Sequence, residues 1–407
     1  MPTILQISIE VNSGSVGRIA EQIGEKIIDK GWESYITFAR NNLPSKSKTI
    51  RIGKKVDVLW HGLMTRIFDN HCLESKSATK KLIQQIKEID PDVIHLHHIH
   101  GYFINMKILF NYLSQANKPI VWTFHDCWSF TGHCAYFDYV DCHKWKTHCG
   151  KCPQKKEYPK SLFLDRSHTN FSQKRDLFNS VSNMTIVPVS YWLGNMVQQS
   201  FLNQHAQRVI QNGIDLQVFR PQVDLEEIKI KYNIANKFVV LGVASIWDRR
   251  KGLDYFIQLS EKINPEFQII LVGLNRKQIK TLPQNVIGIE RTENVNELAK
   301  LYSVADVFVN PTLEDTFPTT NLESLACGTP VVTFRTGGSV ESVSEETGFV
   351  VEKGDLNGLV VAIDEVWKKE KKYYFEFCRK RAESLYNKND NFQNYINLYE
   401  EILKINH

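Results

Sequence analysis

The sequence lacks the features that would assign the chain to a membrane, secreted or nucleic-acid-binding class. No apolar run approaches the roughly 18–20 residues that a membrane-spanning helix needs. The first residues contain no basic segment followed by a long apolar stretch and a small-residue cleavage site, which together make up a signal peptide. Arginine-rich helices, paired Cys/His fingers and the aromatic pattern of RNA-binding sheets are also missing. We therefore expect a cytoplasmic protein that does not bind nucleic acid.

Length and composition point to a globular protein of more than one domain. The 407 residues are too many for one compact core and predict two domains, with three as the alternative. The chain is 42% hydrophobic and 23% charged, which excludes disordered, collagen-like and coiled-coil classes. Its net charge of +5 is too small to identify a partner.

The positive charge is concentrated in residues 40–55, which contain no acidic residue. Such a run is most often a solvated loop. The alternative is a peripheral contact with an anionic membrane or a pyrophosphate-bearing lipid, because each basic side chain near such a surface contributes about 1 kcal/mol. The basic residues of this run are Arg40, Lys46, Lys48, Arg51, Lys54 and Lys55.

Short apolar runs alternate with helical periodicity along both halves of the chain. In the first half, strands are predicted at 3–9, 93–97 and 119–124, with helices at 78–89 and 108–115 between them. The same alternation starts again at a strand predicted at 238–244. Strands that alternate with helices indicate parallel sheets covered on both faces, which is the α/β class.

The turn-rich segment that follows Gln211 separates the two halves, because Asn-Gly and Pro mark a connection there. We predict two doubly wound, Rossmann-like domains that face each other across a ligand-binding cleft. The predicted segments are an N-terminal, acceptor-side domain at 1–210 with a Cys-rich insert at 127–152, a C-terminal domain at 211–385, and a C-terminal helix at 386–407 that packs back onto the body.

One segment of the second half combines acids with a helix start. A strand ends at Asn310, a loop carrying Glu314 and Asp315 follows, and a helix begins near Thr319 with Glu323 along it. The free N–H groups and positive dipole at a helix N-terminus suit a diphosphate, and acids that flank such a site suit sugar hydroxyl groups. A solvated helix acid and an ordinary turn are the alternatives for either acid taken alone.

The whole of this segment resembles the signature of the retaining GT-B glycosyltransferases of the group 1 family (family 4), in which an acid precedes a Glu by eight positions. Asp315 and Glu323 have that spacing. The resemblance implies that Glu323 binds the donor ribose and that the first acid contacts the donor sugar. Because that first position is commonly Glu in the family, Glu314 is a rival to Asp315.

Other segments agree with the resemblance and imply further roles. Arg250 and Lys251 resemble the family's basic clamp on the donor diphosphate, and His125 stands where the family has a His that contacts the transferred sugar. Residues 12–18 resemble the family's N-terminal Gly-rich loop. The donor-binding residues so implied are Gly14, Ser15, Arg250, Lys251, Thr319, Thr320, Asn321 and Glu323, with His125 and Asp315 as catalytic residues.

Neighbouring histidines and cysteines raise the question of a metal. His95, His97, His98 and His100 follow one another closely, but His97 and His98 are expected on opposite faces of a strand, which favours a structural or acceptor-side role. The cysteines form a clearer pattern that ends in C-x2-C and fits a structural tetrahedral Zn²⁺ site, the alternative being free thiols in an acceptor insert. The four cysteines are Cys134, Cys142, Cys149 and Cys152, with His133, His143 and His148 as substitutes for one ligand.

The sequence therefore predicts a retaining glycosyltransferase that needs no cofactor for catalysis, with zinc in a structural role only. The middle segment resembles a branch found in bacterial capsule, exopolysaccharide and O-antigen gene clusters. This implies transfer from a UDP- or GDP-sugar to a glycan or polyprenyl-diphosphate-linked saccharide, at the inner face of the cell membrane. A sugar-nucleotide epimerase of the same fold and a non-catalytic, zinc-stabilised subunit that binds sugar nucleotides remain as alternatives.

Overall fold

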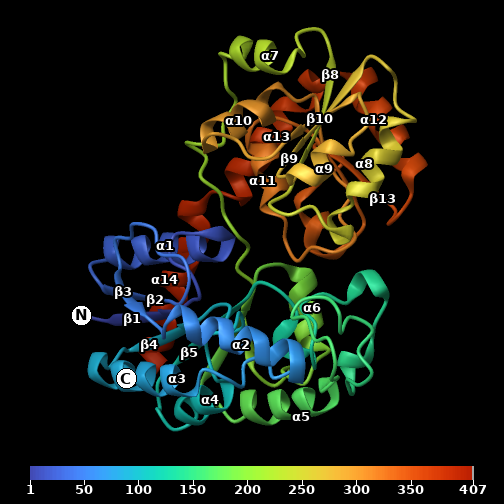
Figure 1. The fold of residues 1–407 in the computed structure, drawn as a ribbon. Coiled ribbons are helices and arrows are strands. Elements are labelled where there is room, and N and C mark those ends of the chain that lie inside the picture. The colour runs from blue at the N-terminus through green and yellow to red at the C-terminus, as the bar shows by residue number, and fades with distance from the viewer. Residues whose placement is uncertain (406–407) are drawn as a thin grey trace. The chain divides into compact units, whose positions relative to one another are not determined.

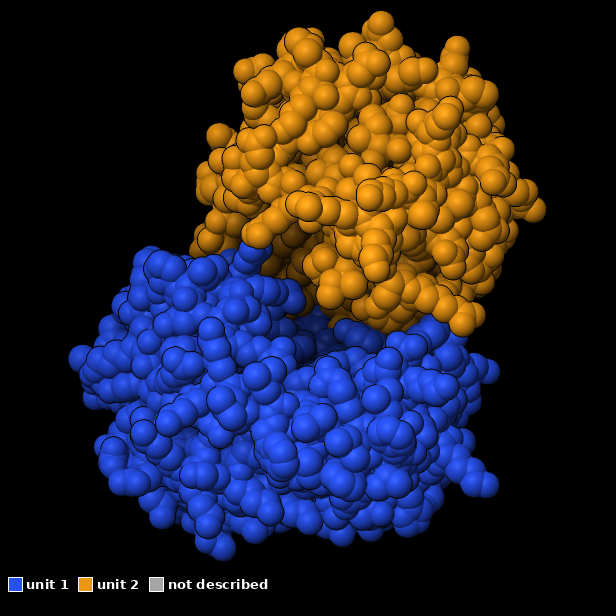
Figure 2. Space-filling model, viewed as in Figure 1, with its two compact units in different colours: residues 1–211, 392–407 blue, residues 212–391 orange. Residues whose placement is uncertain are grey.

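The computed structural model describes residues 1–405, and the chain divides into two compact units. Unit 1 contains residues 1–211 together with the C-terminal segment from Phe392, and unit 2 contains residues 212–391 (Figure 2). Each unit has its own parallel sheet, some of whose strands are labelled in Figure 1.

Unit 1 is built on a seven-stranded sheet in which every neighbouring pair of strands is parallel. Parallel neighbours require crossover connections. Helices between the strands supply them except between β2 and β3, which a loop connects. The strands, in sheet order, are β3 (Lys48–Arg51), β2 (Glu33–Phe38), β1 (Thr3–Ile7), β4 (Val93–Leu96), β5 (Ile120–Phe124), β6 (Met184–Pro188) and β7 (Ala206–Gln207). The helices are α1 (Gly14–Asp29), α2 (Lys55–Phe68), α3 (Lys76–Ile89), α4 (Met106–Leu113), α5 (Ser167–Phe178) and α6 (Tyr191–Gln198), with short 3-10 turns η1 (Trp128–Phe130), η2 (Asp138–Val140) and η3 (Lys144–Lys146).

The C-terminal helix α14 (Lys388–Ile405) contributes to the core of unit 1. From Phe392 onward its apolar side chains pack with the buried face of α1 and with residues of β1, β4, β5 and β6. Its Tyr399 hydroxyl also lies 2.7 Å from Nδ1 of the fully buried His95 on β4. The apolar stripe and this polar contact tie the end of the chain to the first sheet.

Unit 2 is built on a six-stranded sheet that is also parallel throughout. Its strands, in sheet order, are β10 (Val286–Ile289), β9 (Phe267–Val272), β8 (Phe238–Val243), β11 (Val307–Asn310), β12 (Val331–Phe334) and β13 (Gly348–Val351). Its helices are α7 (Glu226–Tyr232), α8 (Leu253–Ser260), α9 (Arg276–Lys280), α10 (Val295–Val304), α11 (Thr319–Ala326), α12 (Leu356–Lys369) and α13 (Lys371–Leu385), with 3-10 turns η4 (Arg249–Lys251) and η5 (Gly337–Ser342).

The predicted α/β class, with two Rossmann-like domains, is confirmed. In both sheets the first strands in sequence lie on one side of a central strand, and the later strands lie on its other side. The strand order reverses between β1 and β4 in unit 1 and between β8 and β11 in unit 2. Ligands of open α/β sheets bind outside the carboxyl ends of the strands at such a reversal.

The basic run at 40–55 is a loop in its first half, residues 40–47, and all six of its basic residues are exposed, as its composition favours. It contains strand β3 and leads directly into α2. Lys46 and Lys48 form ion pairs of 3.0 Å with Glu25 and Glu33, and Arg40 donates a hydrogen bond to the Gly101 carbonyl at 3.0 Å. Within residues 1–405, no helix is both long enough and apolar enough to cross a bilayer.

Candidate active site

The loops that follow β8 and β11 form the centre of the unit 2 site. Residues 244–252 leave the carboxyl end of β8, and residues 311–318 leave the carboxyl end of its neighbour β11. The first loop carries the predicted phosphate clamp and the second carries the predicted acid. Lys251 and Asp315 are 64 positions apart in sequence. Their loops meet because β8 and β11 are adjacent at the reversal of strand order.

Backbone contacts at Gly252 hold these two loops together. Gly252 has φ +80°, and a Cβ atom built on it would lie 2.1 Å from the Pro311 carbonyl oxygen. Beside it, the Leu313 N–H donates to the Arg250 carbonyl at 2.7 Å. A side chain at position 252 would be strained by its φ angle and would also push the loops apart.

We expect Gly252→Ala to lower the thermal midpoint of unfolding by about 5 °C or more, because left-handed strain alone costs about 1–2 kcal/mol. The matched control is Gly31→Ala, where φ is +81° but no atom lies within 4 Å of the added Cβ. Gly31→Ala reports strain without a clash and should shift the midpoint less. Equal shifts in differential scanning calorimetry would contradict the close approach at Gly252.

Arg250, Lys251 and Asp315 form a charged group on these loops. The Lys251 ammonium forms an ion pair with the Asp315 carboxylate, and Arg250 Nη1 donates to the Glu314 carbonyl oxygen at 2.7 Å. Burial raises the pKa of Asp315, but the charges of Lys251 and Arg250 outweigh it and hold the pKa below its usual value. A second carboxylate, Asp248, lies 4.0 Å from Arg250 Nη2, so each cation has an acidic partner. An anion such as a diphosphate would compete with these carboxylates for Arg250 and Lys251.

The two adjacent acids of this loop differ in accessibility. Glu314 is fully buried, whereas Asp315 keeps 13% of its side-chain surface exposed beside Lys251. A ligand that approaches the carboxyl edge of the sheet can reach Asp315 more readily than Glu314.

Helix α11 begins at the predicted diphosphate contact, and its first residues differ from one another. Thr319 and Thr320 are partly exposed, but Asn321 is fully buried. The Asn321 side-chain oxygen accepts a hydrogen bond from the Asn310 side-chain amide at 2.8 Å. The Asn321 backbone N–H donates to the Pro318 carbonyl at 3.2 Å. Asn321 thus anchors the helix to the end of β11, and the first-turn N–H groups of the two threonines are better placed to meet an anion.

Glu323 lies one turn further along α11 and is oriented by a tyrosine. The Tyr302 hydroxyl of α10 donates to Glu323 Oε2 at 2.9 Å. Burial, followed by the charge of Glu323, raises the pKa of Tyr302 well above its usual value, so the phenol remains a donor. The carboxylate is fixed in one orientation while its residue stays partly exposed.

In unit 1, the predicted glycine-rich loop stands at the carboxyl end of β1. Gly14 and Ser15 are the first residues of α1, and both are exposed. Gly14 has φ +62°, and a Cβ there would lie 2.9 Å from Glu10 Oε2. The glycine allows the chain to turn sharply from β1 into α1 and leaves the helix N-terminus accessible.

His125 follows β5 and belongs to a chain of buried polar groups. Its Nε2 lies 3.2 Å from His97 Nδ1, and His97 Nε2 lies 2.9 Å from Gln6 Oε1. Gln6 donates its amide N–H to the Ala20 carbonyl at 2.9 Å, so its oxygen must be the acceptor for His97. His97 therefore carries its proton on Nε2, His125 donates from Nε2, and Nδ1 of His125 is the acceptor nitrogen. Burial lowers the pKa of His125 well below its usual value, which keeps the ring neutral.

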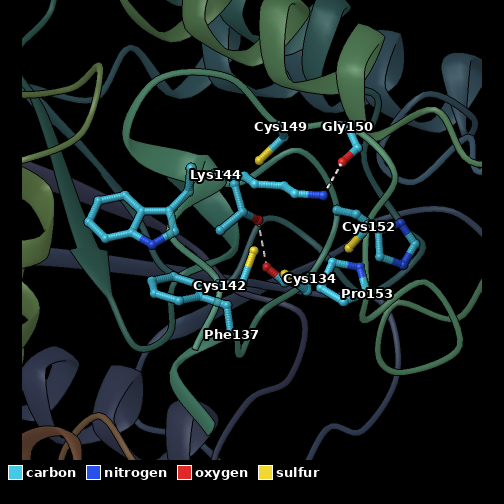
Figure 3. Close-up of a pocket in the computed structure, with 11 residues that line it drawn as sticks. Cys134, Phe137, Cys142, Lys144, Cys149, Gly150, Cys152 and Pro153 are labelled. Carbon is cyan, nitrogen blue, oxygen red and sulfur yellow. Dashed lines mark hydrogen bonds between the residues drawn. The ribbon is translucent and has the colours of Figure 1, made fainter. Parts of the chain in front are cut away.

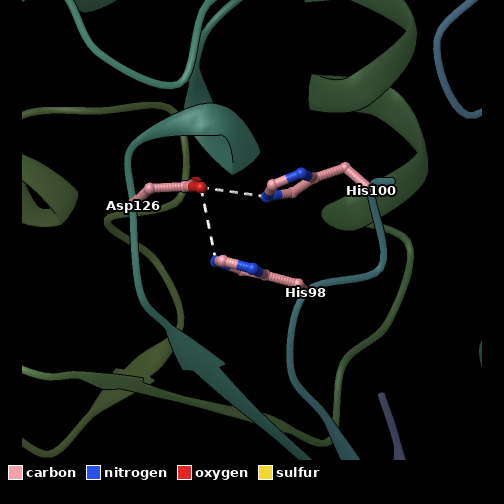
Figure 4. A group of neighbouring side chains, drawn as sticks. All are labelled: His98, His100 and Asp126. Carbon is pink, nitrogen blue, oxygen red and sulfur yellow. Dashed lines mark ion pairs between the residues drawn. The ribbon is translucent and has the colours of Figure 1, made fainter. Parts of the chain in front are cut away.

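Asp126, the next residue, holds two further histidines (Figure 4). His100 Nε2 lies 3.0 Å and His98 Nε2 3.3 Å from the same carboxylate oxygen, Oδ2. Despite burial, these rings keep the pKa of Asp126 below its usual value. Among residues 1–405, these are the only three His, Cys, Asp or Glu side chains whose ligand atoms all lie within 4.8 Å of one another. The expectation that His97 and His98 lie on a strand is wrong, because β4 ends at Leu96.

The four cysteines predicted as metal ligands line one small pocket in the insert (Figure 3). Cys134 and Cys149 are buried, and Cys142 and Cys152 are partly exposed. A hydrogen bond with the Cys134 thiol lowers the pKa of Cys152. The insert is therefore a candidate site separate from the carboxyl edge of the sheet.

The structure brings the predicted residues together in two groups, one in each unit. Arg250, Lys251, Asp315 and the start of α11 share the carboxyl edge of the unit 2 sheet. The first turn of α1 and His125 share the same edge of the unit 1 sheet. Sequence reasoning missed the positioning residues Tyr302, Gln6 and Asp126, of which only Asp126 had a signal, its place directly after His125.

Comparison with known families gives two matches that together span well over half of the chain. Residues 16–218 match the family model described as Glycosyltransferase Family 4, and residues 237–369 match the model described as Glycosyl transferases group 1. A protein of Escherichia coli K12 named as the colanic acid biosynthesis glycosyl transferase WcaC is 23% identical over 380 residues, which cover 88% of this chain and 89% of that protein.

Solved structures resemble the fold along its whole length. Sucrose-phosphate synthase from Thermosynechococcus elongatus has a TM-score of 0.74 at 18% identity and covers 100% of both chains. HepE from Anabaena, determined in complex with UDP, has a TM-score of 0.69 at 16% identity and covers 98% of this chain and 100% of its own. At such identities the likeness establishes the fold alone.

Proposed function

We propose, from the premise that the chain belongs to the group 1 (family 4) glycosyltransferases, that it is a retaining enzyme for which a UDP- or GDP-sugar is the donor. Its role lies in the synthesis of a bacterial surface polysaccharide, as the likeness to WcaC supports. The observation that carries the proposal is that Arg250, Lys251 and Asp315 lie together at the strand-order reversal of unit 2.

The chemistry of the proposed reaction is departure of a nucleoside diphosphate from an anomeric carbon. Negative charge builds on the diphosphate as the sugar becomes oxocarbenium-like, so fixed cations that stabilise this charge lower the barrier. Arg250 and Lys251, with the N–H groups of Thr319 and Thr320, supply that stabilisation. They take the place of a divalent metal, so we propose that catalysis needs no cofactor.

Asp315, rather than Glu314, fills the first acidic position in this proposal. Its side chain is accessible and paired with Lys251, whereas Glu314 is fully buried. Asp315 accepts a hydrogen bond from a hydroxyl group of the donor sugar and holds Lys251 in place. His125 of unit 1 contacts the transferred sugar, and unit 1 carries the acceptor.

Glu323 binds the ribose of the donor, which gives a further prediction. Glu323→Gln should raise KM for the donor by about 5- to 10-fold with little change in kcat, because a carboxylate–hydroxyl bond becomes a weaker neutral one. Steady-state kinetics with the assigned donor measures this. The control is Glu346→Gln, the same change at an exposed glutamate. A fall in kcat at unchanged KM for Glu323→Gln would exclude ribose binding.

An exposed apolar surface supports a peripheral membrane contact on unit 1, which we propose serves a lipid-linked acceptor. Helix α2, labelled in Figure 1, exposes Val56, Leu59, Trp60 and Leu63 at spacings that place them on one face. The Leu162 N–H donates to the Arg66 carbonyl at 2.7 Å, which brings a second exposed apolar segment beside this helix. The residues of this α2 surface are Val56, Leu59, Trp60, Leu63, Leu162, Phe163 and Leu164.

Basic residues border the α2 surface where the helix begins. Lys54 and Lys55 are exposed at its N-terminal end, and Arg51 of β3 precedes them. Apolar side chains bordered by positive charge suit the interface of an anionic bilayer.

We expect the protein to sediment with vesicles that contain anionic lipid and to remain in solution with neutral vesicles. The double variant Leu59→Ser/Trp60→Ser should weaken this binding at least about 10-fold, because two apolar side chains no longer insert. Val361→Ser, an exposed apolar residue of unit 2, is the control. Undiminished binding by the double variant would contradict a contact through α2.

The experiment that tests the proposed function is a screen of UDP- and GDP-sugars with and without lipid-linked and free saccharide acceptors. Acceptor-dependent release of nucleoside diphosphate, without added metal, supports transfer. A product with the same anomeric configuration as the donor supports retention, and the opposite configuration overturns it. Isomerisation of the donor without acceptor would identify an epimerase, and binding without turnover would identify a non-catalytic subunit.

A further inference from the structure

The cysteine-rich insert has little regular secondary structure to hold it in place. Between η1 and α5, residues 131–166 contain only the short turns η2 and η3. Stretches of this length without helices or strands are uncommon in compact domains. Aromatic packing orders part of the insert, since the rings of Phe137 and Trp145 lie 5.0 Å apart. The remaining part is the segment that carries the four thiols.

All four cysteines of the insert line the same pocket (Figure 3). Its volume is about 10 Å³, roughly the space that one water molecule or one ion requires. Thiols from three turns of the chain therefore surround a space of single-atom size. No three of the four sulfur atoms lie within 4.8 Å of one another, so binding an ion would have to draw them inward.

A buried histidine on the pocket wall provides an independent observation. His133 is 2% exposed, and its Nδ1 lies 2.7 Å from Asp69 Oδ1. Its other ring nitrogen, Nε2, is buried and has no hydrogen-bond partner. A buried nitrogen without a partner is costly. Because Nδ1 donates to Asp69, Nε2 becomes a donor when the ring takes up a second proton, and a thiolate in the same pocket would then accept a hydrogen bond from it. A carboxylate that orients a histidine beside a metal site is a common second-layer arrangement.

Hydrogen bonds to a cysteine sulfur and to backbone carbonyl groups order the chain around the pocket. The Gly132 N–H donates to Cys149 Sγ at 3.3 Å, an interaction that strengthens when the sulfur is a thiolate. Lys144 donates to the carbonyl groups of Gly150 and Lys151 at 2.9 and 3.1 Å, and so shapes the turn between the last two cysteines. Lys144 also lines the pocket and adds positive charge to it.

We propose that the insert binds one structural Zn²⁺ ion through the thiolates of Cys134, Cys142, Cys149 and Cys152. Binding releases the four thiol protons and leaves a tetrahedral site of net charge −2, which Lys144 helps to balance. His133 is a positioning residue that keeps one of the released thiol protons: as an imidazolium it donates from Nδ1 to Asp69 and from Nε2 to one of the thiolates. With four protein ligands the site has no open position, so the ion orders the insert and does not enter the sugar-transfer reaction.

The first test is the metal content of the full-length protein, purified without chelators. Mass spectrometry of the dissolved metal should give about one zinc per chain. Refolding with Co²⁺ should give the thiolate charge-transfer and ligand-field bands of a tetrahedral tetrathiolate site. A chain that is folded by circular dichroism and holds no zinc would overturn the proposal, as would a cobalt spectrum with nitrogen ligands.

Variants separate the ligands from the residues around them. Cys142→Ser should lose the zinc, whereas Cys378→Ser, the same change at a buried cysteine of unit 2, should keep it. His133→Ala should keep one zinc but weaken its affinity by about 10- to 100-fold in chelator competition, as expected for a second-layer partner. Full zinc retention by Cys142→Ser would exclude the four-thiolate site. If that variant does not fold, the metal content and cobalt spectrum of the unmodified chain decide the matter.

Discussion

Replacing Lys251 with alanine should lower kcat/KM for the donor by about 10- to 100-fold. The ammonium group is proposed to contact the departing diphosphate, and a charge-assisted hydrogen bond of this kind contributes about 1.5–3 kcal/mol. Because the charge on the leaving group grows in the transition state, most of the loss should appear in kcat. Steady-state assays of nucleoside diphosphate release at varied donor concentration measure both constants.

Lys251 also pairs with the partly buried Asp315, so a structural effect must be separated from a catalytic one. Lys251→Ala leaves the carboxylate without its nearest cation, which should lower the thermal midpoint. The double variant Lys251→Ala/Asp315→Asn removes both charges and should regain most of that stability. Its activity should stay low. Recovery of activity along with stability would show that Lys251 acts only by holding the loop, and Lys372→Ala, an exposed lysine on α13, should change neither quantity.

The sequence was sufficient for the fold and for much of unit 2 because the signals there are local. Alternating apolar runs and helical periodicity identify a parallel α/β sheet, and the start of α11 is marked by Pro318 and the residues after it. The predicted clamp and acid were placed together by one general rule, since loops after adjacent strands meet at the same edge. Direct contact between Lys251 and Asp315 follows from that rule and from the glycine that lets the loops approach.

Residues that act through distant partners could not be found in the same way. Tyr302 is 21 positions from Glu323, and Gln6 is 91 positions from His97, so neither pair leaves a pattern along the chain. The burial of Asn321 was also missed, because its bond to Asn310 depends on how α11 packs on the sheet. Helix α2 was overlooked for a different reason, since its apolar residues face solvent and do not form the core-facing stripe that marks most helices.

His125→Ala should lower kcat by about 100-fold, the second large effect that we expect. The neutral imidazole is proposed to contact the transferred sugar, and a sugar misplaced by about 1 Å from its reacting position can lose about 10²-fold in rate. The ring is held by His97, which Gln6 in turn orients, so its acceptor nitrogen has a fixed direction. Single-turnover assays with saturating donor measure the loss in the chemical step.

The chain that orients His125 offers a graded test of this role. Gln6→Leu removes the acceptor for His97 Nε2 and permits the other tautomer, so His125 would lose its defined direction while remaining in the chain. Its kcat should fall by about 5- to 20-fold, which is less than the fall for His125→Ala. A misdirected imidazole loses only part of its contact with the sugar, whereas alanine loses all of it. The control is His168→Ala, an exposed histidine on α5. If His125→Ala kept full kcat while Gln6→Leu reduced it, the polar chain would serve the fold of unit 1 and not the transferred sugar.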